Sequence, residues 1–220
     1  MDNLIYILFI CVVAPLTLML LMLKKHAKVI IGFMILGIVM SLFVSELNRI
    51  LLGWFDEDYL YVTTTITPLT EEILKAIPVL IYAIFWSEKQ DRILPLAFSI
   101  GIGFGLFENT VILVQNIEGV SIAWAVARGF STALMHGVCT SVIGFGISFI
   151  RKKRKLFYCG TFALLALAGI YHGIYNLLVQ SDYKYLGFAI PVVTYSFVLG
   201  WQFVRRKSKK ESSAAQSSRA

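Results

Sequence analysis

Ionisable side chains interrupt the apolar stretches of this 220-residue sequence at a few positions. The stretch 68–78, PLTEEILKAIP, places Glu71, Glu72 and Lys75 inside an apolar run. A charged side chain at the centre of a membrane helix costs about 2.5–3.5 kcal/mol, so groups retained there generally mark functional sites. Further polar groups lie within other apolar runs: Glu108, Asn109, Arg128, His136, His172 and Asn176.

Glutamate and histidine in a water-filled cavity of the membrane suit three kinds of chemistry. A carboxylate can act as general base on a water molecule that attacks a carbonyl group. Glu108, His136 and His172 offer three ligands for a divalent metal and leave a position for water, as in catalytic zinc sites. The same residue types relay protons or ions in transporters.

The elements that position these residues are membrane helices. The chain is 58% hydrophobic and 15% charged, whereas soluble domains average about 25% charged residues. Its apolar runs are about 20 residues long, the length that a helix needs to cross the hydrocarbon core. Helices are expected because they satisfy their own backbone hydrogen bonds in this environment. We predict an all-α, polytopic bundle of seven transmembrane helices at residues 4–23, 29–51, 62–86, 92–115, 121–150, 156–179 and 185–204.

One membrane domain accounts for residues 1–204, with the chemistry concentrated in residues 62–179. Residues 205–220 are basic and then rich in small polar residues, and we expect a disordered cytoplasmic tail. The three cysteines, Cys11, Cys139 and Cys159, have no paired spacing, so neither a disulfide framework nor a CxxC metal site is predicted. Cys139 follows His136 by three residues and is interpreted as a buried, inert thiol.

The charges between the apolar runs predict the orientation of the chain. Four regions, residues 24–28, 89–92, 151–155 and 205–219, hold 16 of the 20 lysines and arginines. The alternate loops are mainly acidic, with Asp56, Glu57, Asp58, Glu118 and Asp182. The positive-inside rule places the N-terminus outside and the C-terminus in the cytoplasm. The net charge of +7 is therefore an orientation signal supported by anionic lipid, and no nucleic-acid partner is predicted.

The intramembrane groups converge at one depth. With a rise of about 1.5 Å per residue, Glu71 lies about 14 Å below the outer face, and Glu108 and His172 lie about 10 Å below it. His136 lies about 20 Å deep, or less if its helix is tilted. These groups, on four antiparallel helices, predict one shared site in the outer half of the bilayer. The runs are mostly apolar below this level, which favours hydrolysis over a transport path.

Spacing within each helix supports this site. Lys75 follows Glu71 by four residues and Glu72 by three, so it is interpreted as their counter-charge. His172 and Asn176 share one helix face, and Asn109 is either a hydrogen-bonding contact between helices or part of the site. Three further features flank these residues. Pro68 and Pro78 bracket the glutamates, Gly101 and Gly105 allow close helix approach, and Arg128 is expected to snorkel or to form a pair near the outer interface.

Four motifs together resemble the PrsW family of intramembrane proteases: Glu71-Glu72-Ile-Leu-Lys75, Phe104-Gly-Leu-Phe-Glu108-Asn109, His136 and His172-Gly-Ile-Tyr-Asn176. They are also similar to the CAAX prenyl endopeptidase and bacteriocin-processing superfamily, with its motifs EExxxR, FxxxH and HxxxN. The sequence departs from that pattern at two positions. Lys75 stands for the arginine of the first motif, and Glu108 stands for the histidine of the second.

The resemblance implies a role for each of these residues. Glu71 or Glu72 is the water-activating base, Glu108 and His172 form the next polar shell, and Asn176 stabilises the oxyanion. Lys75 and Asn109 support the site. Two mechanisms stay open: a zinc ion bound by Glu108, His136 and His172, or a metal-free mechanism that depends on glutamate, in which protonation of one glutamate relieves the crowded charge.

The resemblance also implies a substrate and a location. The substrate is a single-span membrane protein, an anti-sigma factor, cut first near its extracytoplasmic side in the bacterial plasma membrane. That site-1 cut leads to release of a sigma factor during envelope stress. The alternatives are a proton- or metal-coupled transporter and a non-catalytic membrane scaffold, and the cost of intramembrane carboxylates disfavours the scaffold.

Overall fold

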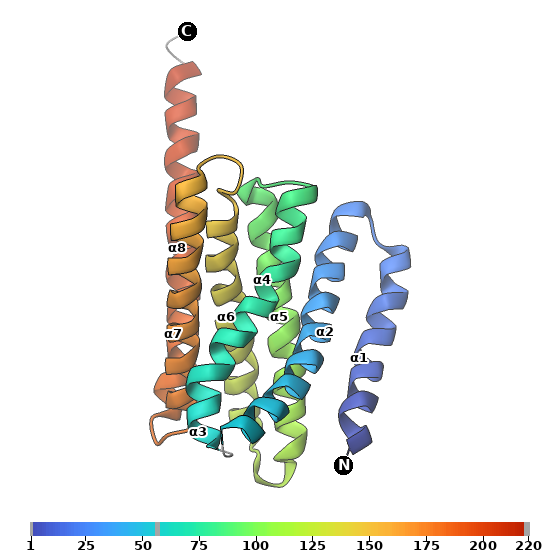
Figure 1. The fold of residues 1–220 in the computed structure, drawn as a ribbon. Helices are drawn as coiled ribbons and strands as arrows, with labels where there is room; N and C mark the ends of the chain where they lie inside the picture. The colour runs from blue at the N-terminus through green and yellow to red at the C-terminus, as the bar shows by residue number, and fades with distance from the viewer. Residues whose placement is uncertain (1, 56–57, 218–220) are drawn as a thin grey trace.

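The computed structural model shows an all-helical bundle whose long helices alternate in direction (Figure 1). It describes the backbone of residues 2–55 and 58–217. Side chains are described for residues 5, 8–55 and 58–201. Within these ranges the long helices are α1 (Asp2–Met22), α2 (Lys25–Trp54), α4 (Thr67–Phe85), α5 (Gln90–Gln115), α6 (Ile122–Ile147), α7 (Thr161–Val179) and α8 (Lys184–Ser217). Short segments connect them: α3 (Tyr59–Tyr61), the π-helices η1 (Val62–Ile66) and η3 (Leu156–Gly160), and the 3₁₀ turn η2 (Ile117–Gly119).

The predicted all-α architecture is confirmed, and a helix occupies each of the seven predicted runs. Among the described residues, four helical segments are long and apolar enough to cross a membrane: Lys25–Trp54, Gln90–Gln115, Ile122–Ile147 and Leu156–Val179. The protein is therefore a multi-pass membrane protein. Helix α4 has the length for a further span, but it carries the three charged residues of the EEILK stretch.

Some predictions concern the ends and loops of the chain. Asp56 and Glu57, used above to orient the chain, and residues 218–220 of the tail lie outside the described residues. We expected disorder from residue 205, whereas α8 continues without a break to Ser217. The lysine, arginine, alanine and glutamine residues of this segment have good helix propensity, which explains how the helix extends past its apolar part.

Helix α5 lies between α2 and α6, and its glycines set the packing. A Cβ atom on Gly101 would overlap the backbone of His136 on α6, and one on Gly103 would overlap the backbone of Met34 on α2. A Cβ on Gly105 would lie 2.8 Å from the ring of His136. The close approach predicted from Gly101 and Gly105 is thus present, and it occurs at the level of His136.

The π-helix η1, Val62–Ile66, leads into α4 along the chain and packs against α7. A π-helical carbonyl accepts a hydrogen bond from the N–H five residues later. For Thr63 that position is Pro68, which has no N–H. Asn176 of α7 fills the gap, because its Nδ2 donates to the Thr63 carbonyl at 2.9 Å. Gly173 lets the two backbones approach, since a Cβ there would overlap a carbonyl of η1.

Part of the apolar core lies at the end of the bundle where α4 ends and α5 begins. Its buried members on α4, α5 and α6 include Val79, Ala83, Ile93, Ala97, Ile100, Ile143 and Ile147. These side chains lie on one side of the polar groups of α4. The polar groups therefore lie between an apolar core and the opposite end of the bundle.

Candidate active site

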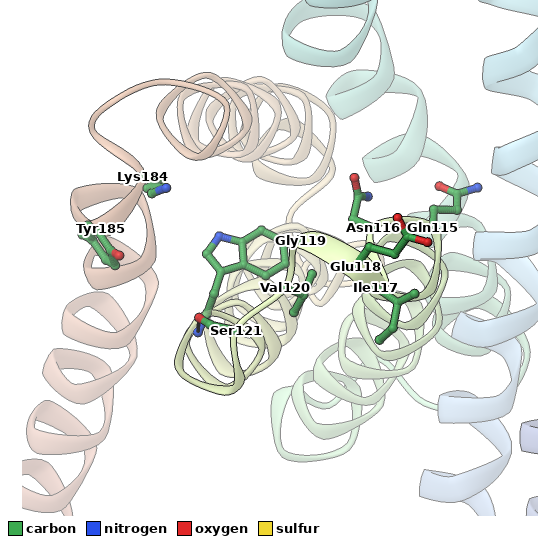
Figure 2. A pocket seen from close by; sticks show the side chains of 10 residues that line it. Gln115, Asn116, Ile117, Glu118, Gly119, Val120, Ser121, Lys184 and Tyr185 are labelled. Carbon is green, nitrogen blue, oxygen red and sulfur yellow. Dashed lines mark hydrogen bonds between the residues drawn. The ribbon is translucent and has the colours of Figure 1, made fainter.

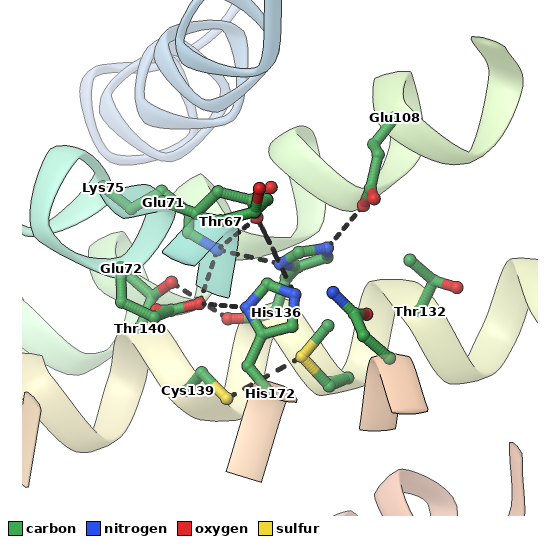
Figure 3. A network of polar contacts seen from close by, with 12 residues as sticks. Thr67, Glu71, Glu72, Lys75, Glu108, Thr132, His136, Cys139, Thr140 and His172 are labelled. Atoms are coloured by element: carbon green, nitrogen blue, oxygen red, sulfur yellow. Dashed lines mark hydrogen bonds and ion pairs between the residues drawn. The ribbon is translucent and has the colours of Figure 1, made fainter. Parts of the chain in front are cut away.

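Four helices bring six ionisable side chains into one buried cluster, drawn in Figure 3. The cluster consists of Glu71, Glu72 and Lys75 from α4, Glu108 from α5, His136 from α6 and His172 from α7. The helices cross where glycines of α5 and α7 allow close packing. All the ionisable residues predicted to share a site are therefore in contact through a chain of hydrogen bonds and ion pairs.

His172 is oriented by Glu72. Its Nδ1 lies 3.2 Å from Oε1 of Glu72 and donates a hydrogen bond to this carboxylate. Its Nε2 has no hydrogen-bond partner among the described residues and lies 3.8 Å from Oε2 of Glu71. A carboxylate on one ring nitrogen fixes the tautomer, so the other nitrogen presents a lone pair to Glu71.

His136 is held in the same way from the other side. Its Nε2 lies 2.6 Å from Oε2 of Glu108. Its Nδ1 faces the centre of the cluster, 2.8 Å from Nζ of Lys75 and 4.0 Å from Oε2 of Glu71. The two imidazole rings meet edge to face with centroids 4.8 Å apart. Each histidine thus has one carboxylate behind it and one nitrogen directed towards Glu71.

Lys75 is the counter-charge of the glutamate pair. Its Nζ lies 2.6 Å from Oε1 of Glu72 and 3.7 Å from Oε2 of Glu71, and it is completely buried. The ammonium also lies 4.3 Å from the ring centroid of Phe104, a cation–π contact. One lysine cannot balance three carboxylates. With both histidines neutral, the cluster has a net charge of −2, which one divalent cation would balance.

The donor atoms fit such a cation. One oxygen of Glu71 and one nitrogen each of His136 and His172 lie within 4.8 Å of one another. Oε2 of Glu71 and Nε2 of His172 have no hydrogen-bond partner among the described residues. Zinc bonds of about 2.0–2.1 Å place neighbouring ligands about 3.3 Å apart, so a small inward movement of these side chains would complete the site.

The ligand set predicted from sequence contains Glu108 with the two histidines, whereas Glu71 is the carboxylate that converges with them here. Glu108 instead contacts the outward nitrogen of His136. Two histidines and one carboxylate remain the composition in either set. A divalent metal held by these residues would supply an activated water and polarise a bound carbonyl group.

A cavity of about 540 Å³ gives access to part of the cluster. Glu71, Glu108 and Asn176 line it, and the side chain of Glu108 is 25% exposed. Glu72 is fully buried outside this lining, so water in the cavity meets Glu71 and Glu108 first. Asn109 is also buried outside it, and its Oδ1 has no partner among the described residues.

A second cavity of about 540 Å³ lies beside the first, at the loop between α5 and α6 (Figure 2). Glu118, Ser121, Lys184 and Tyr185 are among its lining residues. The two cavities share Gln115, Asn116 and Trp124. The second cavity therefore continues the first towards the end of the bundle, and it contains no side chain of the cluster.

Sequence reasoning missed two polar features next to the cluster. Arg128, which was expected to snorkel or to form a pair near the outer interface, has a buried side chain that lines the first cavity. The hydroxyl of Tyr175 lies 3.0 Å from Ser131 Oγ and 2.7 Å from Thr132 Oγ1, a buried contact between α7 and α6. The signal was the presence of Ser131 and Thr132 within an apolar run, one turn before His136.

Comparison with known proteins places this site in context. The family model described as "PrsW family intramembrane metalloprotease" matches residues 25–202. The match begins with α2 and ends in α8, so it includes every residue of the cluster and leaves out α1 and the last part of α8. Searches of the curated proteins and of the solved structures found no match.

Proposed function

Because this chain belongs to the PrsW family of intramembrane metalloproteases, we propose that it makes the first, site-1, cut in a single-span membrane protein near the extracytoplasmic face. The family membership confirms the resemblance predicted from the motifs and identifies the chain as an intramembrane peptidase. The buried group of Glu71, His136 and His172 is the single observation that carries the proposal to a specific site.

The distribution of charge over the two ends of the bundle supports the orientation. The α1–α2, α4–α5 and α6–α7 loops, which carry the basic residues, lie at the end where α8 terminates (Figure 1). The N-terminus and the α5–α6 and α7–α8 loops lie at the opposite end. The positive-inside rule makes the first end cytoplasmic, so we propose an N-terminus outside and a C-terminus in the cytoplasm.

The cavities support access from outside. Both include residues at the end of α5, and the second includes the α5–α6 loop, which this orientation places outside. On the cytoplasmic side of the cluster, the described core of α4, α5 and α6 is mainly apolar, and the buried hydroxyls of Ser99, Thr140 and Ser148 donate to backbone carbonyls three or four residues earlier. A transporter, the alternative function, needs polar access from both faces, so the one-sided arrangement favours hydrolysis.

We propose a division of roles within the cluster. Glu71, His136 and His172 hold the metal, and Glu72 and Glu108 orient the two imidazoles. Glu108 also borders the cavity, where it is positioned to take a proton from water. The sequence instead predicted Glu108 as a ligand and either Glu71 or Glu72 as the base, so the proposed roles exchange Glu108 and Glu71 within the same set of residues.

The family resemblance suggests the biological setting. We propose that the substrate is an anti-sigma factor in the bacterial plasma membrane, and that its cleavage leads to release of a sigma factor during envelope stress. A site in the outer half of the bilayer fits a first cut outside the centre of the membrane, before a second protease acts within it.

The test uses the full-length protein in proteoliposomes with single-span membrane proteins from the same cell, anti-sigma factors among them. Mass spectrometry of the products locates each cut, and bound metal is measured on the same samples. We expect one cut near the extracytoplasmic end of the span, abolished in Glu71→Gln and by a zinc chelator. Glu46→Gln is the matched control, because Glu46 pairs with Arg49 at 3.2 Å outside the cluster.

Cuts on the cytoplasmic side would contradict the proposed orientation. Absence of cleavage, combined with metal-dependent proton uptake by the same liposomes, would favour the transporter. A cut that survives metal removal, with no metal bound, would favour the mechanism that depends on glutamate alone.

A further inference from the structure

We propose that Arg128 binds an acidic side chain of the substrate, an aspartate or glutamate two to four residues from the scissile bond. The inference rests on the proposed function, because it assigns a specificity determinant to the substrate cavity. It starts from the position of one arginine that is outside the metal group and forms no ion pair among the described residues.

Arg128 is 9% exposed and lines the cavity that also contains Glu71 and Glu108. Its Nε is buried and has no hydrogen-bond partner among the described residues. The guanidinium carbon lies 5.4 Å from the ring centroid of Trp124, which lines the same cavity. A mostly buried arginine that lines a cavity and has an unused donor is typical of an anion-binding group.

The other charged groups of the cavity wall already have partners. Oε2 of Glu108 accepts from His136 at 2.6 Å, and Glu71 faces the two histidines and Lys75. Arg49 pairs with Glu46 at 3.2 Å and is exposed. In the described part of the chain, no carboxylate forms an ion pair with Arg128. Glu108 on the same wall lies near enough to attract Arg128 electrostatically but forms no ion pair with it, so the guanidinium keeps N–H donors for a ligand.

A carboxylate fits this group best. The five N–H donors of a guanidinium match the two oxygens of a carboxylate in a bidentate pair, and the ring of Trp124 holds the guanidinium on one face. A substrate that enters the cavity brings such a group as an aspartate or glutamate side chain. Removal from water strengthens the pair, so one acidic residue near the cut contributes strongly to recognition.

The position of the acidic residue follows from helix geometry. Arg128 precedes His136 by eight residues on α6, a separation of about 12 Å along the helix axis. An extended peptide advances about 3.3 Å per residue. An axis separation of about 12 Å thus corresponds to about three or four residues of an extended substrate. Because the arginine side chain can reach towards the cluster, the acidic residue can lie as few as about two residues from the scissile bond.

The test compares fluorogenic single-span peptides with the full-length, metal-loaded protein in maltoside micelles. Each peptide carries one aspartate or the isosteric asparagine at one position within six residues of the cut. Its C-terminus is amidated, so no terminal carboxylate competes. For the wild type we expect an Asp/Asn ratio of kcat/KM of about 10 to 100 at one position two to four residues from the cut.

In Arg128→Gln this ratio should fall to about 1, and in Arg128→Lys it should be intermediate, because a lysine lacks the bidentate geometry. Arg49→Gln is the matched control: it removes the second arginine of the same cavity wall and should leave the ratio unchanged. Arg128→Glu should prefer peptides with lysine at the same position. The thermal unfolding of each variant shows whether it is folded.

Binding of the same peptides to Glu71→Gln, measured by fluorescence anisotropy, separates this inference from the proposed function. Cleavage without an acidic preference in the wild type would overturn the role of Arg128 and leave the protease intact. Peptides that bind through Arg128 but are not cut by the wild type would overturn the proposed function and retain the binding site. An equal Asp/Asn ratio in the wild type and Arg128→Gln would also overturn the inference.

Discussion

The ammonium group of Lys75 lies 2.8 Å from Nδ1 of His136, the same nitrogen that faces Glu71. The space in front of this nitrogen cannot hold both the lysine ammonium and a metal ion bound to the nitrogen. The lysine must then withdraw towards Glu72, to which its Nζ is already bonded at 2.6 Å. Lys75 is thus both the counter-charge of the cluster and a competitor at the proposed metal position.

We predict that Lys75→Met tightens metal binding by about tenfold or more, because it removes both a competing donor and a nearby positive charge. The metal-free variant should lose about 3–5 kcal/mol of stability, since Glu72 becomes a buried carboxylate without its cation. Chelator competition measures the affinity, and thermal unfolding with and without metal measures the stability. Weaker metal binding in Lys75→Met would show that the lysine supports the metal site.

Separate substitutions of Glu71 and Glu108, the two glutamates that line the first cavity, distinguish their roles. We expect Glu71→Gln to lose bound metal, because the Glu71 carboxylate faces both Nδ1 of His136 and Nε2 of His172. Glu108→Gln should retain metal but lower kcat by about 100-fold or more, as expected for loss of a general base. Metal content and kcat are measured on the same preparations. The opposite result would assign Glu108 as ligand and Glu71 as base, which is one of the two arrangements that the sequence left open.

The close contact between α5 and α6 predicts a sharp effect at Gly101. In Gly101→Ala the new Cβ meets the backbone of His136, so the helices must separate and His136 must shift. Stability should fall by about 1–3 kcal/mol, with loss of activity. Gly32→Ala on α2 is the control, because no atom lies within 4 Å of the added carbon. An active, stable Gly101→Ala would show that the helices do not need this approach.

The hydrogen bond from Asn176 to Thr63 predicts a rescue. Asn176→Ala leaves the carbonyl without its donor and should cost about 1 kcal/mol. Pro68→Ala restores a backbone N–H, so Asn176→Ala should cost less in that background. Thermal unfolding of the two single variants and the double variant gives the coupling energy. Additive effects would mean that Pro68 is not the reason for this contact, and kcat of the rescued double variant reports any separate role of Asn176 in catalysis.

The orientation is tested by labelling engineered cysteines in cells. Cys11 and Cys159 are exposed and are first replaced by serine, whereas Cys139 is buried. We expect a membrane-impermeant maleimide to label Glu118→Cys in intact spheroplasts. Lys153→Cys should be labelled only after the membrane is permeabilised. The reverse pattern would place the cluster in the cytoplasmic half of the bilayer and would exclude a site-1 cut.

The helices and the membership of the cluster were predictable, because both depend on local properties of the chain. The length of an apolar run sets a helix, and the depth of a charged residue follows from its position within that run. Glu71, Glu108, His136 and His172 therefore gather as the depth argument predicted. The tail after residue 204 was harder to predict, because its composition suits both a disordered segment and the continuation of α8.

The sequence by itself determined the class of protein, the helices and the residues available for chemistry. The tertiary structure alone decided how those residues pair: Glu72 with His172, Glu108 with His136, and Glu71 between the two histidines. It also placed the buried side chain of Arg128 in the wall of the cavity. The physical reason is that each pairing depends on the rotation of a helix about its axis and on its distance from its neighbours. Glycine contacts between helices distant in sequence set both quantities, and no local pattern along one helix contains them.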